Sequence, residues 1–391
     1  MNRPPQPGAP AAVAVRALDQ IRVESVTTQV VTRTFDRAQW NPRTRWDRKN
    51  VVLALLRTQD GCCGVGEAYC DGGDPSAVCA LIERDLAPLA VGRSLAELGS
   101  IATAMRQSMI VSARGGAAWA AASALDIALW DALGRTLGLP VAWLLGGQRR
   151  RVPAYASAGL YGHGKTTDDL ALEMRGYVDR GFRAVKIKVG GASFADDLAR
   201  VRAVRDAIGP QVGLMVDALY ALDVSQARRM AEALAALEVL FLEAPVHPED
   251  VDGLARVAAG SPVPIAGNEF SFGLDGFRRL LRRDAVDVVH LDAILCGGVS
   301  EAMRICALSS AHHRKVSFHA ASSAVCFAAN LQVAAAAPDV HSIEYHMLHD
   351  LLFDKLPAGT FRLVDGEVEL PSAPGLGLGF DPAQLVASLE E

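Results

Sequence analysis

Residues 184–217 read AVKIKVGGASFADDLARVRAVRDAIGPQVGLMVD, and this stretch decides the fold. It begins with a short apolar run at 184–189, continues through an amphipathic segment and ends with a second apolar run at 213–216. Short apolar runs are typical of strands buried on both faces of a parallel sheet, and the amphipathic segment is typical of a connecting helix. The stretch therefore predicts one strand–helix–strand unit of an α/β protein.

The same unit recurs along the chain at intervals of roughly 25 residues. The apolar runs lie at residues 152–156, 184–189, 213–216, 239–242, 263–266, 286–291, 316–318 and 341–343. Eight parallel strands with intervening helices predict a (β/α) barrel of the TIM type.

The residues before the barrel predict a separate α+β unit. Residues 23–32, 51–57 and 64–67 alternate like the strands of a meander, and helical periodicity follows at 77–89, 95–105 and 117–137. We therefore expect a disordered tail at 1–19, a capping domain at 20–147, the barrel at 148–358 and a C-terminal segment at 359–391 that packs on the capping domain.

Composition narrows the class of function. The 391 residues are 50% hydrophobic and 21% charged, with a formal net charge of −5, so the chain can bury a large core and has no excess of basic residues for nucleic acid or an anionic membrane. The most apolar window, 115–130, contains Asp126 and is shorter than the roughly 20 residues of a membrane span. Seven cysteines show no Cys-x-x-Cys spacing, and residues 11–15 are too short for a signal-peptide core. We expect a cytoplasmic protein that acts on a small molecule.

Almost every predicted barrel strand ends in a charged or titratable residue. In chain order from the second strand these are Lys186 and Lys188, Asp217, Glu243, Glu269, Asp292, His319 and Glu344. A single such residue is ordinary, as a solvated strand end or a helix N-cap, but seven successive strand ends are not. Strand ends of a barrel meet at one face, where buried charges must be paired or bind a metal.

Three of these carboxylates predict a metal site. Asp217, Glu243 and Glu269 come from successive strands and offer only oxygen ligands, which suit a hard cation such as Mg²⁺ that keeps positions for water or substrate. No cysteine ends a neighbouring strand to join His319 as a ligand, which disfavours zinc.

The arrangement resembles the mandelate racemase subgroup of the enolase superfamily. From Lys188 to His319 the strand-end residues follow one another at intervals of 23 to 29 residues, a register similar to that of the subgroup. Residues 124–147, ALDIALWDALGRTLGLPVAWLLGG, are similar to the helix and turn that close the family's capping domain. The resemblance therefore spans nearly the whole chain.

The resemblance implies two groups that transfer protons. Lys188 would be a base on one face of the substrate, with Lys186 beside it holding its pKa down by like-charge repulsion. His319 would be the acid or base on the opposite face, oriented and made more basic by Asp292.

The resemblance also implies how charge on the substrate is stabilised. Asp217, Glu243 and Glu269 would hold Mg²⁺, which binds the substrate carboxylate and stabilises the enediolate formed when the α-proton leaves. Glu344 would donate a hydrogen bond, if protonated, to the oxygen that the metal does not neutralise. The chain departs from the family pattern at Leu219, where many relatives carry Asn, and at Ala244, where Glu is commoner.

Several other residues can be interpreted either as substrate-binding or as purely structural. The segment at 35–50 carries Trp40, Arg43, Arg45, Trp46 and Arg48, which are suited to cover a polyhydroxy acid, but a solvated hairpin loop explains them equally well. After the first barrel strand, Tyr161, His163 and Lys165 lie near the expected mouth of the barrel.

The remaining candidates favour the structural interpretation. His290 faces inward and would support the Asp292 pair or be an ordinary core histidine. His346 and His349 are expected to be surface residues. Gly297 and Gly298 resemble a phosphate-binding turn, although loop geometry alone requires such residues.

We therefore expect a lyase that dehydrates an acid sugar, an aldonate or aldarate, to its 2-keto-3-deoxy product. An isomerase, either a racemase or epimerase of a 2-hydroxy acid or a sugar-lactone cycloisomerase, uses the same proton abstraction and is the alternative. A non-catalytic ligand-binding barrel is disfavoured, since binding alone does not require Lys188, Asp292 and His319. The resemblance also implies a homo-oligomer.

Overall fold

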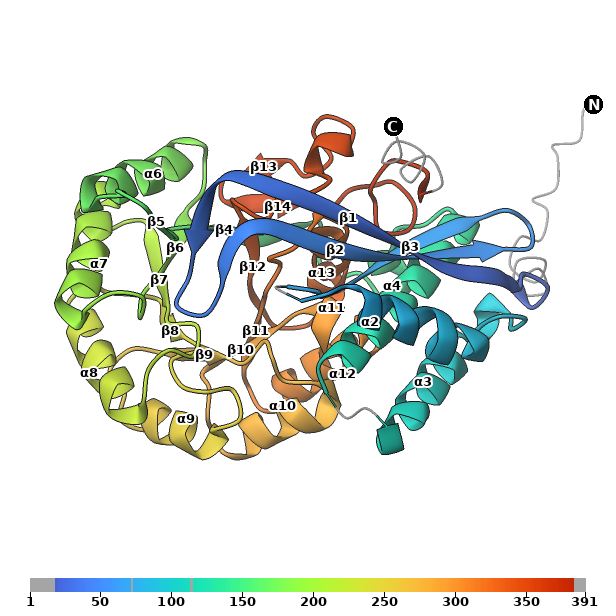
Figure 1. The fold of residues 1–391 in the computed structure, drawn as a ribbon, viewed down its shortest axis with the longest axis horizontal. Helices are drawn as coiled ribbons and strands as arrows, with labels where there is room; N and C mark the ends of the chain where they lie inside the picture. Colours follow the sequence, from blue (N-terminus) through green and yellow to red (C-terminus); the bar gives the residue numbers. More distant parts are fainter. Residues whose placement is uncertain (1–17, 72, 113–114, 383–391) are drawn as a thin grey trace, which may run out of the picture.

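The computed structural model describes residues 18–71, 73–112 and 115–382, so most of the tail expected at 1–19 lies outside it. Eight parallel strands form a closed barrel, because the last strand pairs back with the first. They are β4 (Arg151–Ser157), β6 (Ala184–Lys188), β7 (Gly213–Asp217), β8 (Phe241–Glu243), β9 (Ile265–Gly267), β10 (Val288–Leu291), β11 (Lys315–Phe318) and β12 (Val340–His346). The predicted barrel is confirmed (Figure 1).

Helices cover the outside of the barrel (Figure 1). They are α6 (Thr167–Asp179), α7 (Phe194–Ile208), α8 (Val224–Ala235), α9 (Val251–Ala258), α10 (Gly273–Arg282), α11 (Ala293–Cys296), α12 (Gly298–Ala311) and α13 (Ala324–Ala336). Several begin at an N-cap whose side-chain oxygen accepts from the first turn, as Thr166 does for α6 and Asp223 for α8. Such caps fix where these helices begin after the loops that follow the strand ends.

The capping domain is an antiparallel sheet backed by helices. Strands β1 (Val23–Trp40), β2 (Arg45–Thr58) and β3 (Cys63–Ala68) form the meander, and α4 (Ala117–Leu137) crosses it. Gly66 permits the close crossing, because a Cβ there would lie 1.9 Å from the carbonyl oxygen of Ala124. The other elements are α2 (Ser76–Ala80), η1 (Leu81–Leu86), η2 (Ala87–Leu89), η3 (Leu95–Glu97), α3 (Leu98–Ser112) and α5 (Val141–Leu144).

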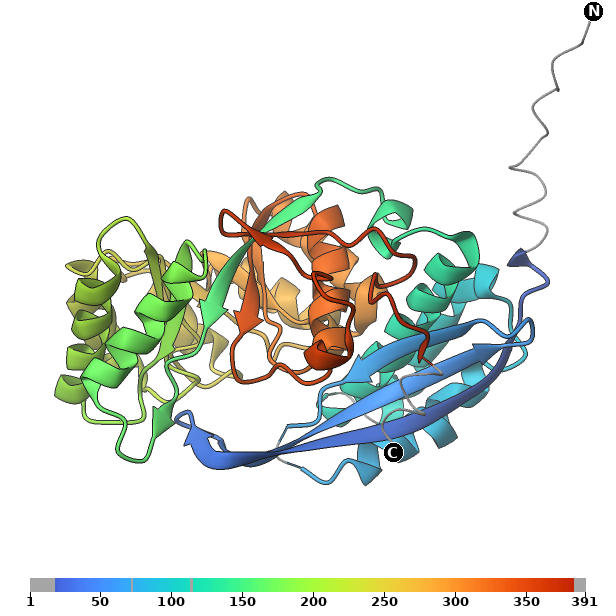
Figure 2. The same ribbon diagram turned by 90° about the horizontal axis from the view of Figure 1, so that it is seen from above.

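The first hairpin is longer than the sequence predicts. β1 and β2 continue through most of the segment expected to be a loop, and only residues 41–44 form the turn. The turn closes because the Asn41 side chain accepts from the backbone N–H groups of Arg43 and Thr44. Near its tip β1 also pairs with β5 (Tyr161–Gly162), which follows the first barrel strand. Figure 2 shows this hairpin running from the body of the capping domain to the barrel.

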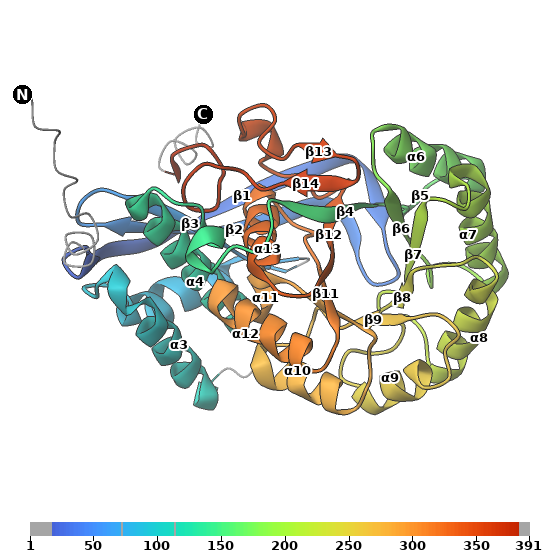
Figure 3. The same cartoon turned by 180° about the vertical axis from the view of Figure 1, so that it is seen from behind.

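The C-terminal segment contacts both domains rather than the capping domain alone. After η4 (Phe353–Lys355), β13 (Leu363–Val364) and β14 (Glu367–Glu369) form a hairpin that pairs with β4 (Figure 3). Beyond it, the backbone N–H of Leu376 donates to Asp131 and Arg135 donates to the Phe380 carbonyl, so this part packs on α4. Within the described ranges, no helix is both long enough and apolar enough to cross a membrane.

Candidate active site

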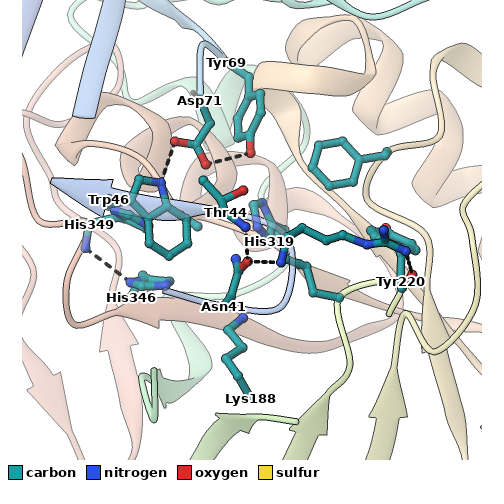
Figure 4. A pocket seen from close by; sticks show the side chains of 14 residues that line it. Asn41, Thr44, Trp46, Tyr69, Asp71, Lys188, Tyr220, His319, His346 and His349 are labelled. Atoms are coloured by element: carbon teal, nitrogen blue, oxygen red, sulfur yellow. Dashed lines mark hydrogen bonds between the residues drawn. The ribbon is translucent and has the colours of Figure 1, made fainter. Parts of the chain in front are cut away.

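The strand-end residues meet beneath the tip of the first hairpin. The predicted residues Lys186, Lys188, Asp217, Glu243, Glu269, Asp292, His319 and Glu344 are all buried. A cavity of about 110 Å³ opens above them, lined by Lys188 and His319 from the barrel and by Asn41, Arg43 and Thr44 from the hairpin turn. Figure 4 shows Lys188 extending into this cavity toward Asn41.

His319 and Asp292 form the expected pair. The ring Nδ1 of His319 lies 2.7 Å from Oδ2 of Asp292. The other ring nitrogen, Nε2, takes no part in this pair, and the His319 side chain lines the cavity. Burial lowers the pKa of His319, but the nearby Glu344 carboxylate and the Asp292 hydrogen bond outweigh it and raise the pKa to about 9. His319 is therefore a proton donor at neutral pH.

The two lysines occupy different environments. The Lys186 ammonium lies 2.7 Å from Glu243 and 3.2 Å from Glu344, and although burial opposes it, these carboxylates raise its pKa well above the usual range. The Lys188 ammonium lies 2.5 Å from Oδ2 of Asp217, and the Lys186 ammonium lies 4.0 Å from the same oxygen. Lys186 is thus a fixed cation, whereas Lys188 lines the cavity.

The carboxylates fit a bound cation. Glu243, Glu269 and His290 bring ligand atoms within 4.8 Å of one another, and both oxygens of Glu269 are buried without a well-formed hydrogen bond to any described residue. Burial and the charges of Glu243 and Asp217 raise the pKa of Glu269 and outweigh His290 and His319, which lower it. Asp217 is in register with Glu243 on the adjacent strand, but its Oδ2 is held by Lys188.

Glu344 lies close to three cationic side chains of the site. Burial raises its pKa, but the cations Lys186, His319 and Lys188 outweigh burial and hold the pKa well below the usual range. Glu344 therefore carries a negative charge in this geometry, and its Oε2 accepts a hydrogen bond from the backbone N–H of Ala320. Its role as a hydrogen-bond donor, which requires a protonated carboxyl, stays a prediction.

His290 contacts the carboxylates and also the ring of His319. Its Nδ1 lies 2.9 Å from Glu243 and 3.9 Å from Glu269, and its Nε2 lies 3.4 Å from the Tyr155 hydroxyl. The alternation of the strand correctly turns it inward, where its ring also meets the ring of His319 at a centroid distance of 5.8 Å. His290 is thus a further candidate for the metal centre.

Two histidines expected at the surface are buried beside the cavity. His346 and His349 are 4% and 3% exposed, and their ring centroids lie 4.2 Å apart. β12 continues to His346, and the chain then folds back so that the Leu351 carbonyl accepts from Ala324 N–H. Trp46 packs on His349 with ring centroids 4.8 Å apart (Figure 4).

The capping domain adds polar groups that the sequence did not single out. Asp71 accepts hydrogen bonds from Trp46 Nε1 at 2.8 Å and from the Tyr69 hydroxyl at 3.3 Å, and all three residues line the cavity. Tyr69 and Asp71 follow β3, whose pattern looks like any half-buried strand, so no sequence signal marked them. Of the arginines and tryptophans at 35–50, Arg43 and Trp46 line the cavity.

The residues after the first barrel strand do not line the cavity. The Tyr161 hydroxyl donates to Asp197 at 2.5 Å, His163 packs against Trp40, and Lys165 pairs with Glu173. Their positions follow from β5, which joins this segment to the capping sheet instead of leaving it over the mouth.

Gly297 and Gly298 form no phosphate-binding turn at the mouth. A Cβ on Gly298 would lie 2.3 Å from the carboxylate of Asp126, and Gly297 N–H donates to Ser123, so both pack against α4. Of the two departures from the family pattern, Leu219 lines the cavity as an apolar side chain, and Ala244 is buried.

Replacing Asp292 by Asn should lower the pKa of His319 from about 9 toward 6.5, because the imidazolium loses its charged partner. The folded-state pKa lies above the usual value, so this pair stabilises the fold fully below about pH 6.5, and the contribution is lost as the pH rises through about 9. NMR titration of the metal-free protein, with His319→Asn to assign the resonance, measures both values. An unchanged pKa in the variant would show that Asp292 does not control the ring.

Two family models and several known proteins match most of the chain. Residues 24–146 match the family model of the mandelate racemase/muconate lactonizing enzyme N-terminal domain, and residues 169–384 match the enolase C-terminal domain-like model. The arabinonate dehydratase of Saccharolobus solfataricus is 33% identical over 84% of this chain and 87% of its own. The D-galactarolactone cycloisomerase of Agrobacterium fabrum is 33% identical over 92% and 96%.

A solved racemase from Streptomyces coelicolor A3(2) with bound magnesium is similar to the whole fold. The TM-score is 0.83 at 28% identity, and the match covers 93% of this chain and 99% of that one. Both family models and relatives above 30% identity cover the greater part of the chain. This chain is an enzyme of the enolase superfamily and belongs to its mandelate racemase/muconate lactonizing enzyme family.

Proposed function

We propose that this enzyme dehydrates an acid sugar, an aldonate or aldarate, to a 2-keto-3-deoxy acid in a Mg²⁺-dependent reaction. One observation carries the proposal: Lys188 and His319 line the same cavity but come from strands on different sides of the barrel, with four strands between them one way and two the other. A substrate between them would have one proton-transfer group on each face.

The carboxylates suit the metal that this reaction needs. Asp217, Glu243 and Glu269 would hold Mg²⁺, with His290 beside them, and the bound metal would supply positive charge to the substrate carboxylate. Lys186 remains a buried cation between Glu243 and Glu344. Its ammonium lies 4.0 Å from the Asp217 oxygen that also holds Lys188, so the two cations share one carboxylate.

The protons and bonds balance for a dehydration. Lys188 would take the proton from C2, next to the carboxylate. His319, which is protonated at neutral pH, would give its proton to the hydroxyl on C3 as the C3–O bond breaks and water leaves. The resulting enol would become the 2-keto-3-deoxy acid by taking a proton at C3.

A cycloisomerase of a sugar lactone is the second candidate. The relative from Agrobacterium fabrum acts, by its name, on D-galactarolactone and matches slightly more of this chain than the arabinonate dehydratase does. In that reaction the C2 proton would again go to Lys188, but the leaving oxygen would be the ring oxygen. A racemase or epimerase would use the same two groups without loss of any oxygen.

Proton NMR of the purified enzyme with Mg²⁺ in D₂O, against a panel of aldonates, aldarates and their lactones, tests the proposal. We expect loss of a C3 hydroxyl and a new signal from the deoxygenated carbon for at least one acid sugar. Lactone conversion without loss of water would identify a cycloisomerase, and α-proton exchange or inversion alone would identify a racemase. Silence across the panel, with Mg²⁺ bound, would overturn the assignment of an acid sugar or its lactone as the substrate.

The homo-oligomer and the cytoplasmic location remain predictions from the sequence. Sedimentation of the purified protein and fractionation of the native cells would check them.

A further inference from the structure

A buried amide on α13 holds Asp292 in place. Asn330 is fully buried, its Nδ2 donates to Oδ1 of Asp292 at 2.7 Å, and its Oδ1 accepts from the backbone N–H of Ala293 at 2.9 Å. The backbone N–H of Ile294 donates to the same Asp292 oxygen at 3.0 Å. With Oδ1 bonded in this way, Oδ2 of Asp292 remains for His319. The amide cannot rotate without breaking two bonds.

The helix that carries Asn330 is itself held by the capping domain. Glu67, a fully buried residue of β3, accepts hydrogen bonds from the Ser323 hydroxyl and, at 2.9 Å, from the backbone N–H of Cys326. These donors lie at the N-cap and in the first turn of α13, where the helix dipole favours a carboxylate. The Sγ of the same Cys326 lies 3.8 Å from Asp292.

We propose that Asn330 is a positioning residue for the Asp292–His319 pair, and that Glu67 fixes the helix from which Asn330 reaches it. Neither residue lines the cavity, so both act through Asp292. A polar path thus runs from the sheet of the capping domain to the proton-transfer pair on the barrel. As a consequence, the position of the capping domain on the barrel determines the orientation of His319, in addition to covering the substrate. The catalytic part of this inference rests on the proposed function.

Asn330→Ala tests the first step, with Gln332→Ala as its matched control. Gln332 is a buried amide on the same helix that accepts from Ala142 N–H at 2.7 Å and donates to the Leu376 carbonyl at 3.0 Å, so it makes the same kinds of bond without touching Asp292. Both variants should show a similar fall in melting temperature. Only Asn330→Ala should lower the pKa of His319 in the metal-free protein, and lower kcat at least about 10-fold with KM within about 2-fold.

Equal effects of the two variants on the pKa of His319 and on kcat would overturn the assignment of Asn330. If alanine at 330 prevents folding, Asn330→Asp keeps the shape and the bond from Ala293 but loses the donor to Asp292. Its kcat should fall at least about 10-fold, and that of Gln332→Glu should not. The NMR readout requires no turnover, so a wrong substrate class would leave it intact and the two failures remain distinguishable.

Glu67→Ala tests the second step, with Asp126→Ala as its control. Asp126 is another buried carboxylate of the capping domain, and it accepts from the N–H and hydroxyl of Ser300, at 2.9 and 2.6 Å, in the first turn of α12. Both changes remove one contact between the domains. Only Glu67→Ala should lower kcat, by about 3- to 10-fold, and shift the His319 resonance in the direction seen for Asn330→Ala. Equal effects would overturn the link to the capping domain.

Discussion

Replacing Lys188 by Ala is expected to reduce turnover by about 10³-fold or more and to abolish exchange of the substrate α-proton with D₂O. General acid–base groups typically contribute about 10²- to 10⁴-fold, and every proposed reaction begins with this proton transfer. His319→Asn should reduce dehydration by a similar factor, but Lys188 would still exchange the α-proton. The difference in α-proton exchange between the two variants assigns Lys188 and His319 each to one face of the substrate.

The chain offers a control for each substitution. Lys165→Ala and His163→Asn alter residues near the barrel mouth that lie outside the cavity, with Lys165 paired to Glu173 and His163 packed on Trp40. Both should keep turnover within about 2-fold, as surface changes usually do. Full turnover in Lys188→Ala and His319→Asn would disprove the mechanism. If exchange persists in Lys188→Ala and stops in His319→Asn, the two groups act on the opposite faces of the substrate from those proposed.

The barrel can be predicted because its strands leave a simple pattern. Each strand is buried on both faces, so it reads as an apolar run, and each run ends where the chain enters a polar loop. Strand ends of a parallel barrel must meet at one face, so residues as distant in sequence as Lys188 and His319 can be placed together from the spacing of the runs alone. The pattern defines the boundaries less closely, and β8 begins at Phe241 where the apolar run begins at 239.

The parts that depend on how loops fold cannot be predicted in this way. The pattern around His346 and His349 is that of a surface loop, but the chain folds back after the strand end and Trp46 from the capping domain packs on His349, so both histidines are buried. Asn330 lies in an alanine-rich helix and Glu67 in an ordinary strand, with no periodicity that marks either as a partner of the active site.

The sequence pattern also cannot predict which charged side chains pair with one another. The pattern predicts Asp217 as a metal ligand, but its pairing with Lys188 depends on side-chain directions that strand register alone does not give. The charge of Glu344 likewise depends on how near Lys186 and His319 lie, which the pattern does not give.

Glu269→Gln is expected to abolish stabilisation by Mg²⁺ while leaving the metal-free protein as stable as the wild type or more so. Burial and the charges of Glu243 and Asp217 raise the pKa of Glu269, so the ionised group costs folding free energy, and the cost grows as the pH rises from about 4.5 through the raised value. Gln keeps the shape without the charge. In the wild type, Mg²⁺ at a hundred times its Kd should add about 2.7 kcal/mol, because it binds only the folded state.

Thermal melts with and without Mg²⁺ measure both effects, and Glu301→Gln is the control. Glu301 is also a buried glutamate, but it accepts from Leu274 N–H and pairs with Arg304, so its replacement should lower the melting temperature and leave the Mg²⁺ shift intact. A Glu269→Gln protein that Mg²⁺ stabilises as much as the wild type would remove Glu269 from the ligand set. A loss of stability in the metal-free variant would mean that Glu269 already has a counter-charge within the protein, since only an unbalanced carboxylate gains from neutralisation.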